Sequence, residues 1–330
     1  IDRPVRQATA YICGLGQFEL FLNGEKTGDH FLDPAWTKFD RSVQYVTFDV
    51  TDRLREGGNA VGVMLGNGFF NIPNERYTKF VGSYGAPKMI FKLQIEYGDG
   101  STETLVSDAA WKATPGPVTF SSIYGGEDYD ANLERKGWNE AGFDDNDWND
   151  VVLASFDSPL VSQRTTPLEI RQAIPPFRKY RNGRGNYLYD LGQNASGIVR
   201  LKLKADGRHT VRMFPSELQG ADSTADQRSS GGPYILSYTT RGDGTQECWQ
   251  PRFTYYGFRY VEVEGAVPAG EPNPDGLPEI TELTGLHTTN SAEAVGSFEC
   301  SNPLFNRIYT LIDWAIRSNF SSVFTDCPHR

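Results

Sequence analysis

Hydrophobic and polar residues alternate with the period of a β-strand through much of the first half of the chain. We expect strands at 8–13, 17–22, 44–50 and 60–65, with a tight turn at Asn23-Gly24 after the second. The clearest alternation is at 89–97, where five large apolar side chains share one face: Met89, Phe91, Leu93, Ile95 and Tyr97. No amphipathic helix is predicted here, and strands at this spacing favour a sandwich or jelly roll.

A second β-rich block is predicted from about 177 to 286. The stretch 155–176 before it holds four prolines and is interpreted as a connector. Two Gly-rich segments, 220–232 and 265–278, are predicted to be exposed loops. The strand candidates of this block are 186–190, 198–204, 210–214, 235–238, 259–264 and 280–286. They predict a second β-sandwich.

The pattern changes to helical spacing at Ser301. Ser301-Asn302-Pro303 has a polar cap followed by proline in the first turn, which is typical of a helix start. Apolar residues from Leu304 to Phe320 then recur at helical intervals. One amphipathic helix cannot bury its own apolar face. The chain is therefore expected to end inside a third domain, which gives predicted domains at 1–155, 156–288 and 289–330.

Composition narrows the function without defining it. Of the 330 residues, 13% are aromatic, which suits sheet faces and sugar-binding surfaces, and the formal net charge is −10. No Lys/Arg cluster is present, which argues against nucleic acid and anionic membranes as partners. No apolar run is long enough to insert into a membrane. The start, Ile1-Asp2-Arg3-Pro4, is not a signal peptide and leaves the compartment open.

The cysteines and histidines indicate neither a zinc site nor a disulfide framework. Cys13, Cys248, Cys300 and Cys327 form no Cys-x-x-Cys pair, and the histidines are scattered. A chain of this length builds its core without disulfides. We expect reduced, mostly buried thiols. Signatures of serine hydrolases, zinc proteases and nucleotide-binding loops are also absent from the sequence.

The last residues, Thr325-Asp326-Cys327-Pro328-His329-Arg330, allow two interpretations. Asp326 is suited to cap another helix, with Pro328 in its first turn. The alternative is a binding role for its carboxylate. The residue types alone favour the cap.

A set of ordered motifs resembles glycoside hydrolase family 78, the bacterial α-L-rhamnosidases. The set runs from the predicted first sandwich to the end of the chain, and each motif is weak alone. It comprises Leu22–Lys26, Leu65–Phe70, Tyr124–Ala131, Tyr189–Asn194, Trp249–Val263, Gly296–Leu304 with Asn306–Tyr309, Ser318–Phe320, and Thr325–Arg330. The last of these matches the family landmark Asp-Cys-Pro-x-Arg.

This resemblance implies a mainly β fold and a hydrolytic activity. The expected architecture is a lectin-like, galactose-binding-like jelly roll, then a concanavalin-like sandwich, then the start of an (α/α)6-barrel-type helical domain. The implied reaction is hydrolysis of terminal α-L-rhamnosides with inversion, which uses one carboxylic acid and one carboxylate. The implied partner is a rhamnose-containing oligo- or polysaccharide. No cofactor is required for that chemistry, and the oligomeric state stays open.

The resemblance also assigns site residues. It places Asp326 on the rhamnose hydroxyls, and Arg330 matches the motif arginine, which is able to hold nearby carboxylates. The family's general acid follows this arginine and its general base lies far downstream, so the chain holds no catalytic pair. We expect this polypeptide alone to be inactive. A glycan-degrading parent favours a periplasmic or extracellular location.

A second candidate site lies at Glu127, Asp128 and Asp130, with Tyr124 as a stacking face. Related N-terminal domains are lectin-like, and some bind rhamnose through calcium, which takes several hard oxygen ligands. The alternative is an acidic turn that is simply solvated. The sequence thus offers a calcium-assisted sugar site as a hypothesis.

Two other classes of protein remain as alternatives to an enzyme fragment. The first is a non-catalytic pair of carbohydrate-binding or structural sandwiches, which has no use for the helix that starts at Ser301. The second is an adhesion protein of repeated sandwiches, and no internal repeat links the two β blocks.

Overall fold

The computed structural model describes residues 1–328, and the chain divides into two compact units. The first unit comprises residues 1–72, 82–116 and 133–165, and the second comprises 73–81, 117–132 and 166–330. The predicted domain boundaries follow the chain in order, whereas two short segments of the first half pack with the second unit. The boundaries 1–155, 156–288 and 289–330 therefore stay a prediction about the order of domains in sequence.

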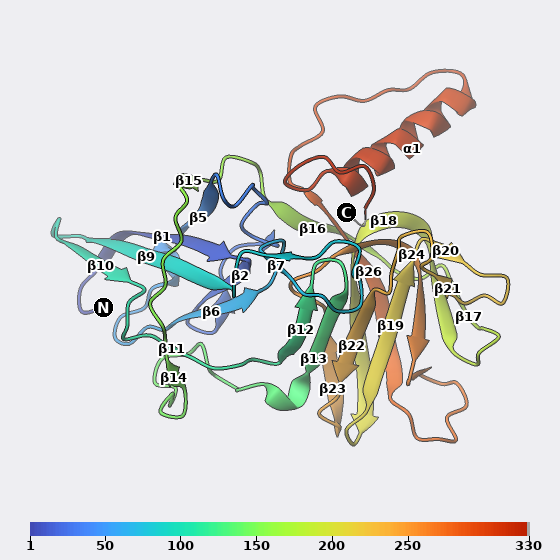
Figure 1. Cartoon of the computed structure of the whole chain (residues 1–330), viewed down its shortest axis with the longest axis horizontal. Helices are drawn as coiled ribbons and strands as arrows, with labels where there is room; N and C mark the ends of the chain where they lie inside the picture. Colours follow the sequence, from blue (N-terminus) through green and yellow to red (C-terminus); the bar gives the residue numbers. More distant parts are fainter. Residues whose placement is uncertain (329–330) are drawn as a thin grey trace. The chain divides into compact units, whose positions relative to one another are not determined.

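The first unit is a two-sheet sandwich, as expected (Figure 1). One sheet has the order β10-β9-β1-β5-β15 and the other β3-β2-β6. The strands are β1 Val5–Leu15, β2 Gln17–Leu22, β3 Glu25–Lys26, β4 His30–Phe31, β5 Val43–Asp49, β6 Val61–Gly66, β7 Asn71–Ile72, β8 Gly82–Ser83, β9 Lys88–Tyr97, β10 Thr102–Val106, β11 Lys112–Ala113, β14 Asn149–Asp150 and β15 Leu160–Ser162, with a 3-10 turn at Thr51–Arg53.

The alternation in β9 is confirmed by burial. Phe91, Leu93, Ile95 and Tyr97 are all at most 4% exposed and pack with residues of β1, β2 and β5 in one core. Between them, even-numbered side chains face away from this core. The turn at Asn23-Gly24 is also confirmed, since both residues have positive φ, which this turn type requires.

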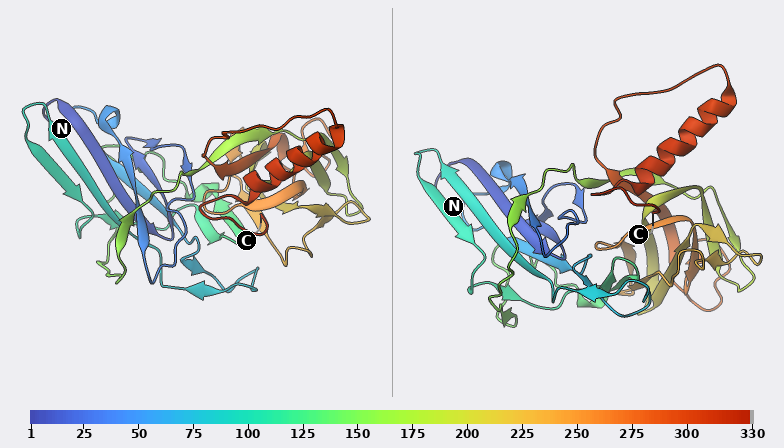
Figure 2. Two further views of the ribbon diagram at one scale, coloured as in Figure 1. Left: turned by 90° about the horizontal axis from the view of Figure 1, so that it is seen from above. Right: turned by 45° about the horizontal axis from the view of Figure 1, so that its top comes forward.

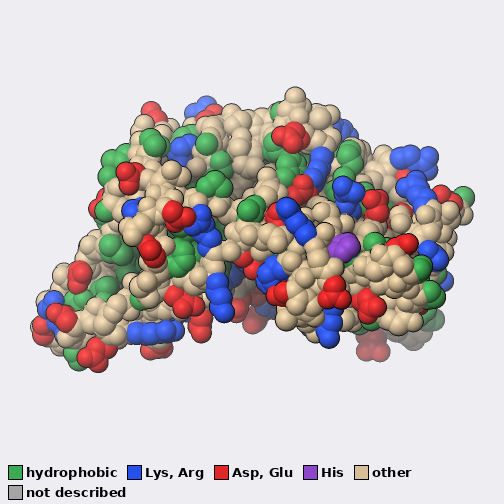
Figure 3. Space-filling view, turned by 90° about the horizontal axis from the view of Figure 1, so that it is seen from below, with side chains coloured by type: hydrophobic (Ala, Val, Ile, Leu, Met, Phe, Trp, Pro, Cys, Tyr) green, Lys and Arg blue, Asp and Glu red, His purple; other side chains and the backbone are tan. Residues whose placement is uncertain are grey.

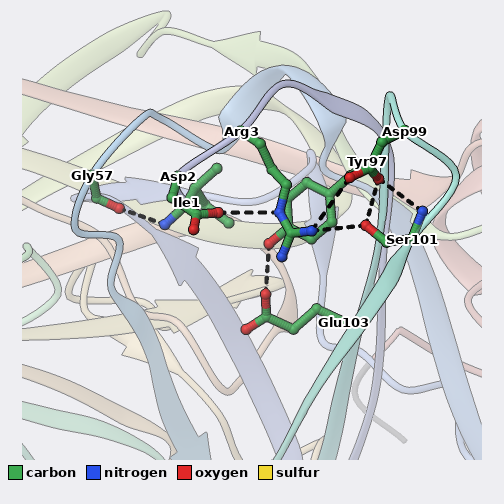
Figure 4. A network of polar contacts seen from close by, with 8 residues as sticks. All are labelled: Ile1, Asp2, Arg3, Gly57, Tyr97, Asp99, Ser101 and Glu103. Atoms are coloured by element: carbon green, nitrogen blue, oxygen red, sulfur yellow. Dashed lines mark hydrogen bonds and ion pairs between the residues drawn. The ribbon is translucent and has the colours of Figure 1, made fainter.

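Polar contacts tie the N-terminal residues to β9 and β10 in the first unit (Figure 4). The Arg3 guanidinium donates to Asp2, Asp99 and Ser101 and lies 4.3 Å from the centroid of the Tyr97 ring. A hydrogen bond from the Tyr97 hydroxyl to Glu103, 2.6 Å long, raises the pKa of Tyr97. These contacts hold the start of the chain against one edge of the sandwich.

The second unit is built on one curled sheet with the order β12-β13-β22-β19-β24-β18-β26-β16, and β17, β23 and β25 pair with its strands. Figure 2 shows the curl from two further sides. The elements are β12 Val118–Ser122, β13 Gly126–Asp130, β16 Leu168–Ile174, β17 Arg178–Arg181, β18 Tyr187–Asp206, β19 Thr210–Ser216, β20 Leu218–Gln219, β21 Ala225–Asp226, β22 Ile235–Thr239, β23 Asp243–Trp249, β24 Tyr256–Glu264, β25 Val267–Pro268 and β26 Glu279–Asn290. A 3-10 turn follows β13 at Ala131–Leu133.

Several details of the second block differ from the prediction. The connector 155–176 contains β15 and β16, because β16 pairs with β26 and long-range pairing overrides the local proline signal. β23 was not predicted, and its pairing with β18 is what extends it. The predicted strands at 186–190 and 198–204 are one strand, β18, interrupted by a bulge between Asp190 and Ala195.

The predicted helix is confirmed as α1, Pro303–Asn319. The Asn302 side chain caps it by accepting from the Leu304 N–H at 3.0 Å, and proline occupies the first turn. Its apolar residues, among them Leu304, Leu311 and Ile316, are 49–61% exposed. Within residues 1–328, no helix combines the length and apolarity needed to cross a membrane.

The cysteine prediction is half right. All four thiols are free, but only Cys13 is buried, and Cys248 is exposed, so "mostly buried" is wrong. Cys248 lies in β23, on the strand face opposite to the core, because its neighbours Glu247 and Trp249 point inward. On the face that Figure 3 shows, acidic and basic side chains are interspersed.

Candidate functional site

The segment after α1 turns back and is tied to the end of β26. Asn290 donates through its backbone N–H to the Phe320 carbonyl at 3.0 Å and through its side chain to the Ser321 carbonyl at 3.0 Å. The Phe320 and Phe324 rings stack at 4.4 Å. The Thr325 N–H donates to the Asn319 carbonyl at 2.9 Å. These bonds close a short loop that presents Asp326.

Asp326 is exposed, and the residues next to it lie against β24. A Cβ atom placed on Gly257 would lie 2.6 Å from Cβ of Pro328, so only glycine allows this approach. The same Cβ would lie 3.4 Å from a Glu217 carboxylate oxygen. Glu217 in turn accepts a 2.9 Å hydrogen bond from the Asn194 side chain. Four segments far apart in sequence therefore meet at Gly257.

Two buried tyrosines, Tyr255 and Tyr256, directly precede Gly257 in the sequence. Burial raises the pKa of Tyr255 to about 12, and likewise raises the pKa of Tyr256 to about 12. The Tyr256 hydroxyl contacts the Ser230 hydroxyl, and Tyr255 bonds to Ser321 in the segment that carries Asp326. These bonds join the start of β24 to the loop that holds Ser230 and to the segment that carries Asp326.

The buried carboxylate of Asp190 lies at the start of the β18 bulge that contains Asn194. Asp190 is 0% exposed and accepts hydrogen bonds of 2.7 and 3.0 Å from Arg259, 3.1 Å from Arg178 and 2.9 Å from the Gly192 N–H. The hydrogen bonds from Arg259, followed by those from Gly192 and Arg178, lower the pKa of Asp190 against the opposing effect of burial. Gly192 has a φ of 75°, which suits the bulge.

The four residues predicted as a sugar or calcium site lie on or beside β13 but have separate partners. Glu127 is 0% exposed and accepts from the backbone N–H groups of Arg252 and Phe253 at 2.9–3.1 Å. Asp128, on the opposite strand face, is paired with Arg76. Asp130, one strand step on, pairs with Arg208 at 2.6 Å, and Tyr124 stacks on Tyr77 at 5.4 Å.

Among residues 1–328, no group of three or more His, Cys, Asp or Glu side chains is arranged to hold a metal ion. Glu127 in particular serves the backbone of the loop that precedes β24. Calcium-assisted binding at Glu127, Asp128 and Asp130 therefore stays a prediction of the sequence.

The calcium hypothesis is tested by calorimetry. L-rhamnose is titrated into the chain with calcium and with a chelator, and into Asp128→Asn. Heat that requires both calcium and Asp128 supports the site, since calcium needs several carboxylate oxygens. The absence of heat in both buffers removes the hypothesis.

The structure therefore brings some predicted residues together and not others. Pro328, two residues after Asp326, lies at Gly257 beside Glu217, which binds Asn194, whereas Glu127, Asp128 and Asp130 lie on two strand faces. Glu217 was missed, because a lone glutamate after a strand carries no signal. Arg330 lies outside the described residues.

Family models match nearly the whole chain. The α-L-rhamnosidase N-terminal domain matches residues 3–172, the bacterial α-L-rhamnosidase concanavalin-like domain matches 180–286, and the bacterial α-L-rhamnosidase 6-hairpin glycosidase domain matches 293–330. The concanavalin-like match covers β17 to β26 without its last residues, and the glycosidase match includes α1 and Asp326.

Similar proteins carry the same description. An α-L-rhamnosidase of Formosa agariphila is 35% identical over 100% of this chain and 35% of its own length. One of Streptomyces avermitilis is 36% identical over 99% and 31%. The chain thus spans about a third of the length of these curated relatives.

Solved structures agree with the sequence matches. The α-L-rhamnosidase from Dictyoglumus thermophilum superimposes with a TM-score of 0.88 at 38% identity, over 99% of this chain and 36% of that one. The Streptomyces avermitilis enzyme, solved in complex with L-rhamnose, has a TM-score of 0.91 at 36% identity, over 99% and 31%. On the family models and these relatives, the chain belongs to the bacterial α-L-rhamnosidases, a family of glycoside hydrolases.

Proposed function

We propose that this chain forms a sugar-binding part of an enzyme that hydrolyses terminal α-L-rhamnosides in oligo- or polysaccharides. The observation that carries the proposal is the exposed Asp326 carboxylate, in a segment that the glycosidase model matches and whose Pro328 lies against Gly257 of the concanavalin-like domain. An exposed carboxylate at a fixed position is suited to accept two hydrogen bonds from neighbouring sugar hydroxyls.

The groups that meet at Gly257 support sugar recognition over phosphate recognition. The Asn194 amide and the Glu217 carboxylate add donors and acceptors at the place where Pro328 lies. Tyr255 and Tyr256, which directly precede Gly257, are buried and add no charge at neutral pH. The two carboxylates disfavour a phosphate, and together with the Asn194 amide they offer several hydrogen-bonding positions to a hydroxyl-rich ligand.

The reaction that we propose proceeds with inversion. A carboxylic acid protonates the leaving oxygen while a carboxylate activates water on the opposite face of the sugar, the two groups lying roughly 6.5–9.5 Å apart. We assign neither group to this chain. The role of Asp326 is to hold the rhamnose ring, and the chemistry needs proton transfer and water without a cofactor. A location outside the cytoplasm is part of the same proposal.

The activity is tested on an aryl α-L-rhamnoside. We expect no turnover above blank from residues 1–330 alone, and turnover when the chain is continued by the remainder of a 6-hairpin glycosidase domain. The initial sugar product is expected to be the β-anomer, since inversion reverses the configuration. Time-resolved proton NMR of the anomeric signals distinguishes the two anomers before mutarotation.

Two results contradict the proposal. Hydrolysis by residues 1–330 alone shows that the catalytic pair lies in this chain, and an α-anomeric first product shows retention. Failure of the continued polypeptide to hydrolyse any aryl α-L-rhamnoside, while it remains folded, removes the assigned activity.

A further inference from the structure

A pocket lies on the second unit at the segment predicted to be the exposed loop 220–232. It is open to solvent, has a volume of about 670 Å³ and is lined by residues between Gly220 and Pro233 together with Arg184. The segment is folded into the β20–β21 hairpin, and its Asp222 carbonyl accepts from the Gly183 N–H at 3.0 Å. The volume falls in the range of small-ligand sites, which is roughly 300–1,000 Å³. We call this cavity the loop pocket.

The walls of the loop pocket are held in place by the sheet. The Gln227 side chain donates to the carbonyls of Pro215 and Tyr234 at 2.7 and 2.8 Å. The Ala225 N–H donates to the Glu262 carboxylate at 2.8 Å. Because the protein's own groups make these bonds, they hold the walls in place, and such preorganisation favours binding.

Charges in the loop pocket balance. Arg228 donates to Asp226 at 2.9 and 2.7 Å, and these bonds lower the pKa of Asp226 to about 2. Asp222 accepts from the Thr224 hydroxyl at 2.7 Å, and Arg184 lies close enough to contribute to a lowered Asp222 pKa. Two cations and two anions leave no net charge for an ionic ligand, whereas their spare donor and acceptor positions suit hydroxyl groups.

The rest of the lining is small and largely apolar, with Ala221, Ala225 and Pro233 beside three glycines. Short side chains leave room for a ring and offer contact to its C–H groups. Fixed polar groups around an apolar surface are the usual composition of a site for a small neutral molecule.

The loop pocket adjoins the candidate site through one contact. Ser230, in the same loop, bonds to the Tyr256 hydroxyl, and the next residue, Gly257, lies against Pro328. Gly231 lines the pocket and lies near Tyr77. The loop thus has one side on the cavity and the other on the strand that supports Asp326.

We propose that the loop pocket binds a neutral saccharide unit of the rhamnose-containing substrate, in addition to the rhamnose held at Asp326. This inference rests on the proposed function and deepens it, because it makes the chain a receptor for glycosides with a second sugar. The binding energy comes from hydrogen bonds to Asp222 and the two guanidinium groups and from contact with the alanine surface.

Binding is measured by calorimetry of residues 1–330 with the neutral disaccharide α-L-rhamnosyl-(1→6)-D-glucose. Ala221→Trp fills the cavity without removing a hydrogen bond, and Asp222→Ala removes an acceptor. Each is expected to weaken binding of the disaccharide by at least about tenfold, because Asp222→Ala removes a hydrogen bond and the indole of Ala221→Trp occupies the space of the sugar. L-rhamnose alone is expected to be unaffected by either change.

Asp243→Ala is the matched control. Asp243 makes the same local turn, accepting from the Thr245 N–H at 3.0 Å and hydroxyl at 2.5 Å, but does not line the loop pocket. The affinity of the Asp243→Ala variant for the disaccharide is expected to equal that of the wild type. An equal loss in Asp243→Ala and Asp222→Ala, or unchanged binding in Ala221→Trp, overturns the inference.

Two further outcomes separate the inference from the function. Tighter binding of galacturonate than of the neutral disaccharide shows an anion site and overturns the neutral assignment. If residues 1–330 bind no disaccharide while the continued polypeptide hydrolyses an aryl α-L-rhamnoside, the inference about the loop pocket is contradicted and the proposed function is supported. The opposite result is also informative. If the disaccharide binds and Ala221→Trp abolishes this binding, but the continued polypeptide hydrolyses nothing, the loop pocket is supported and the proposed activity is contradicted.

Discussion

Replacement of Asp190 by alanine is expected to lower the free energy of unfolding of the second unit by about 3 kcal/mol, because it leaves two guanidinium groups and a backbone N–H without their buried acceptor. Asp190 is 0% exposed and accepts four hydrogen bonds from Arg259, Arg178 and the Gly192 N–H. The estimate is at the low end for such a pair, since the Arg178 and Arg259 side chains are 52% and 36% exposed and regain water.

The effect of Asp190 depends on pH with a definite sign. The bonds from Arg259 lower its pKa in the folded chain below the ordinary value of 3.8. The stabilisation is therefore complete above the unfolded-state pKa and is lost as pH falls through the lowered folded-state value. The free energies of unfolding of wild type and Asp190→Ala are expected to show their largest difference at about pH 7 and a smaller difference at about pH 3 and below.

Denaturant unfolding at the two pH values checks this. Tryptophan fluorescence is suitable because Trp249 lies in the core of the same unit. Asp243→Ala, an exposed turn carboxylate of the same unit, serves as the control and is expected to change little. A loss for Asp190→Ala that is the same at both pH values shows packing damage without charge pairing, and no loss at all shows that the network does not stabilise the fold.

Replacement of Asp326 by asparagine is expected to reduce kcat/KM on an aryl α-L-rhamnoside by about 10²–10³-fold in the continued polypeptide. Hydrogen bonds to an ionised acceptor contribute roughly 1.5–3 kcal/mol each, and two sugar hydroxyls on one carboxylate account for this loss. The amide keeps the size of the carboxyl group but replaces one acceptor oxygen with a donor. Thermal unfolding is expected to be unchanged, because Asp326 is exposed.

Asp313→Asn is the control for this experiment. Asp313 is also an acidic residue near the end of the described chain, and it pairs with Arg317 on α1 at 2.5 Å, in an exposed i,i+4 arrangement. Its replacement is expected to leave kcat/KM within about twofold of the wild type, as exposed pairs contribute less than about 1 kcal/mol. Near-normal hydrolysis by Asp326→Asn, or an equal loss in both variants, refutes the role of Asp326.

Local patterns predicted the elements whose signals are local. The apolar face of β9 followed from strict alternation, and the start of α1 followed from a side-chain cap and a proline in the first turn. The turn at Asn23-Gly24 followed from the two residues that tolerate positive φ. Each of these depends on the backbone preferences of a few consecutive residues, which the sequence states directly.

Pairings between distant segments were not available from such patterns. The sequence predicts a connector where β16 lies, because this strand is stabilised by pairing with β26, more than a hundred positions later. The sequence predicts that the carboxylates of Glu127 and Asp128 belong to one acidic cluster. In the structure, Glu127 accepts hydrogen bonds from the backbone of Arg252 and Phe253, and Asp128 pairs with Arg76. Adjacent residues in a strand point to opposite faces, so closeness in sequence did not mean a shared site.

The sequence by itself determined the succession of two β-rich regions and a capped helix, and through its ordered motifs the family and the candidate Asp326. Only the tertiary structure decided what meets near the segment that carries Asp326: Gly257 admits Pro328, the bulge after Asp190 places Asn194 on Glu217, and the folded 220–233 segment lines an open pocket. The reason is physical. A capping side chain or an alternating face acts within a few residues, whereas a site depends on which strands pair, and that is settled by the burial of the whole sheet.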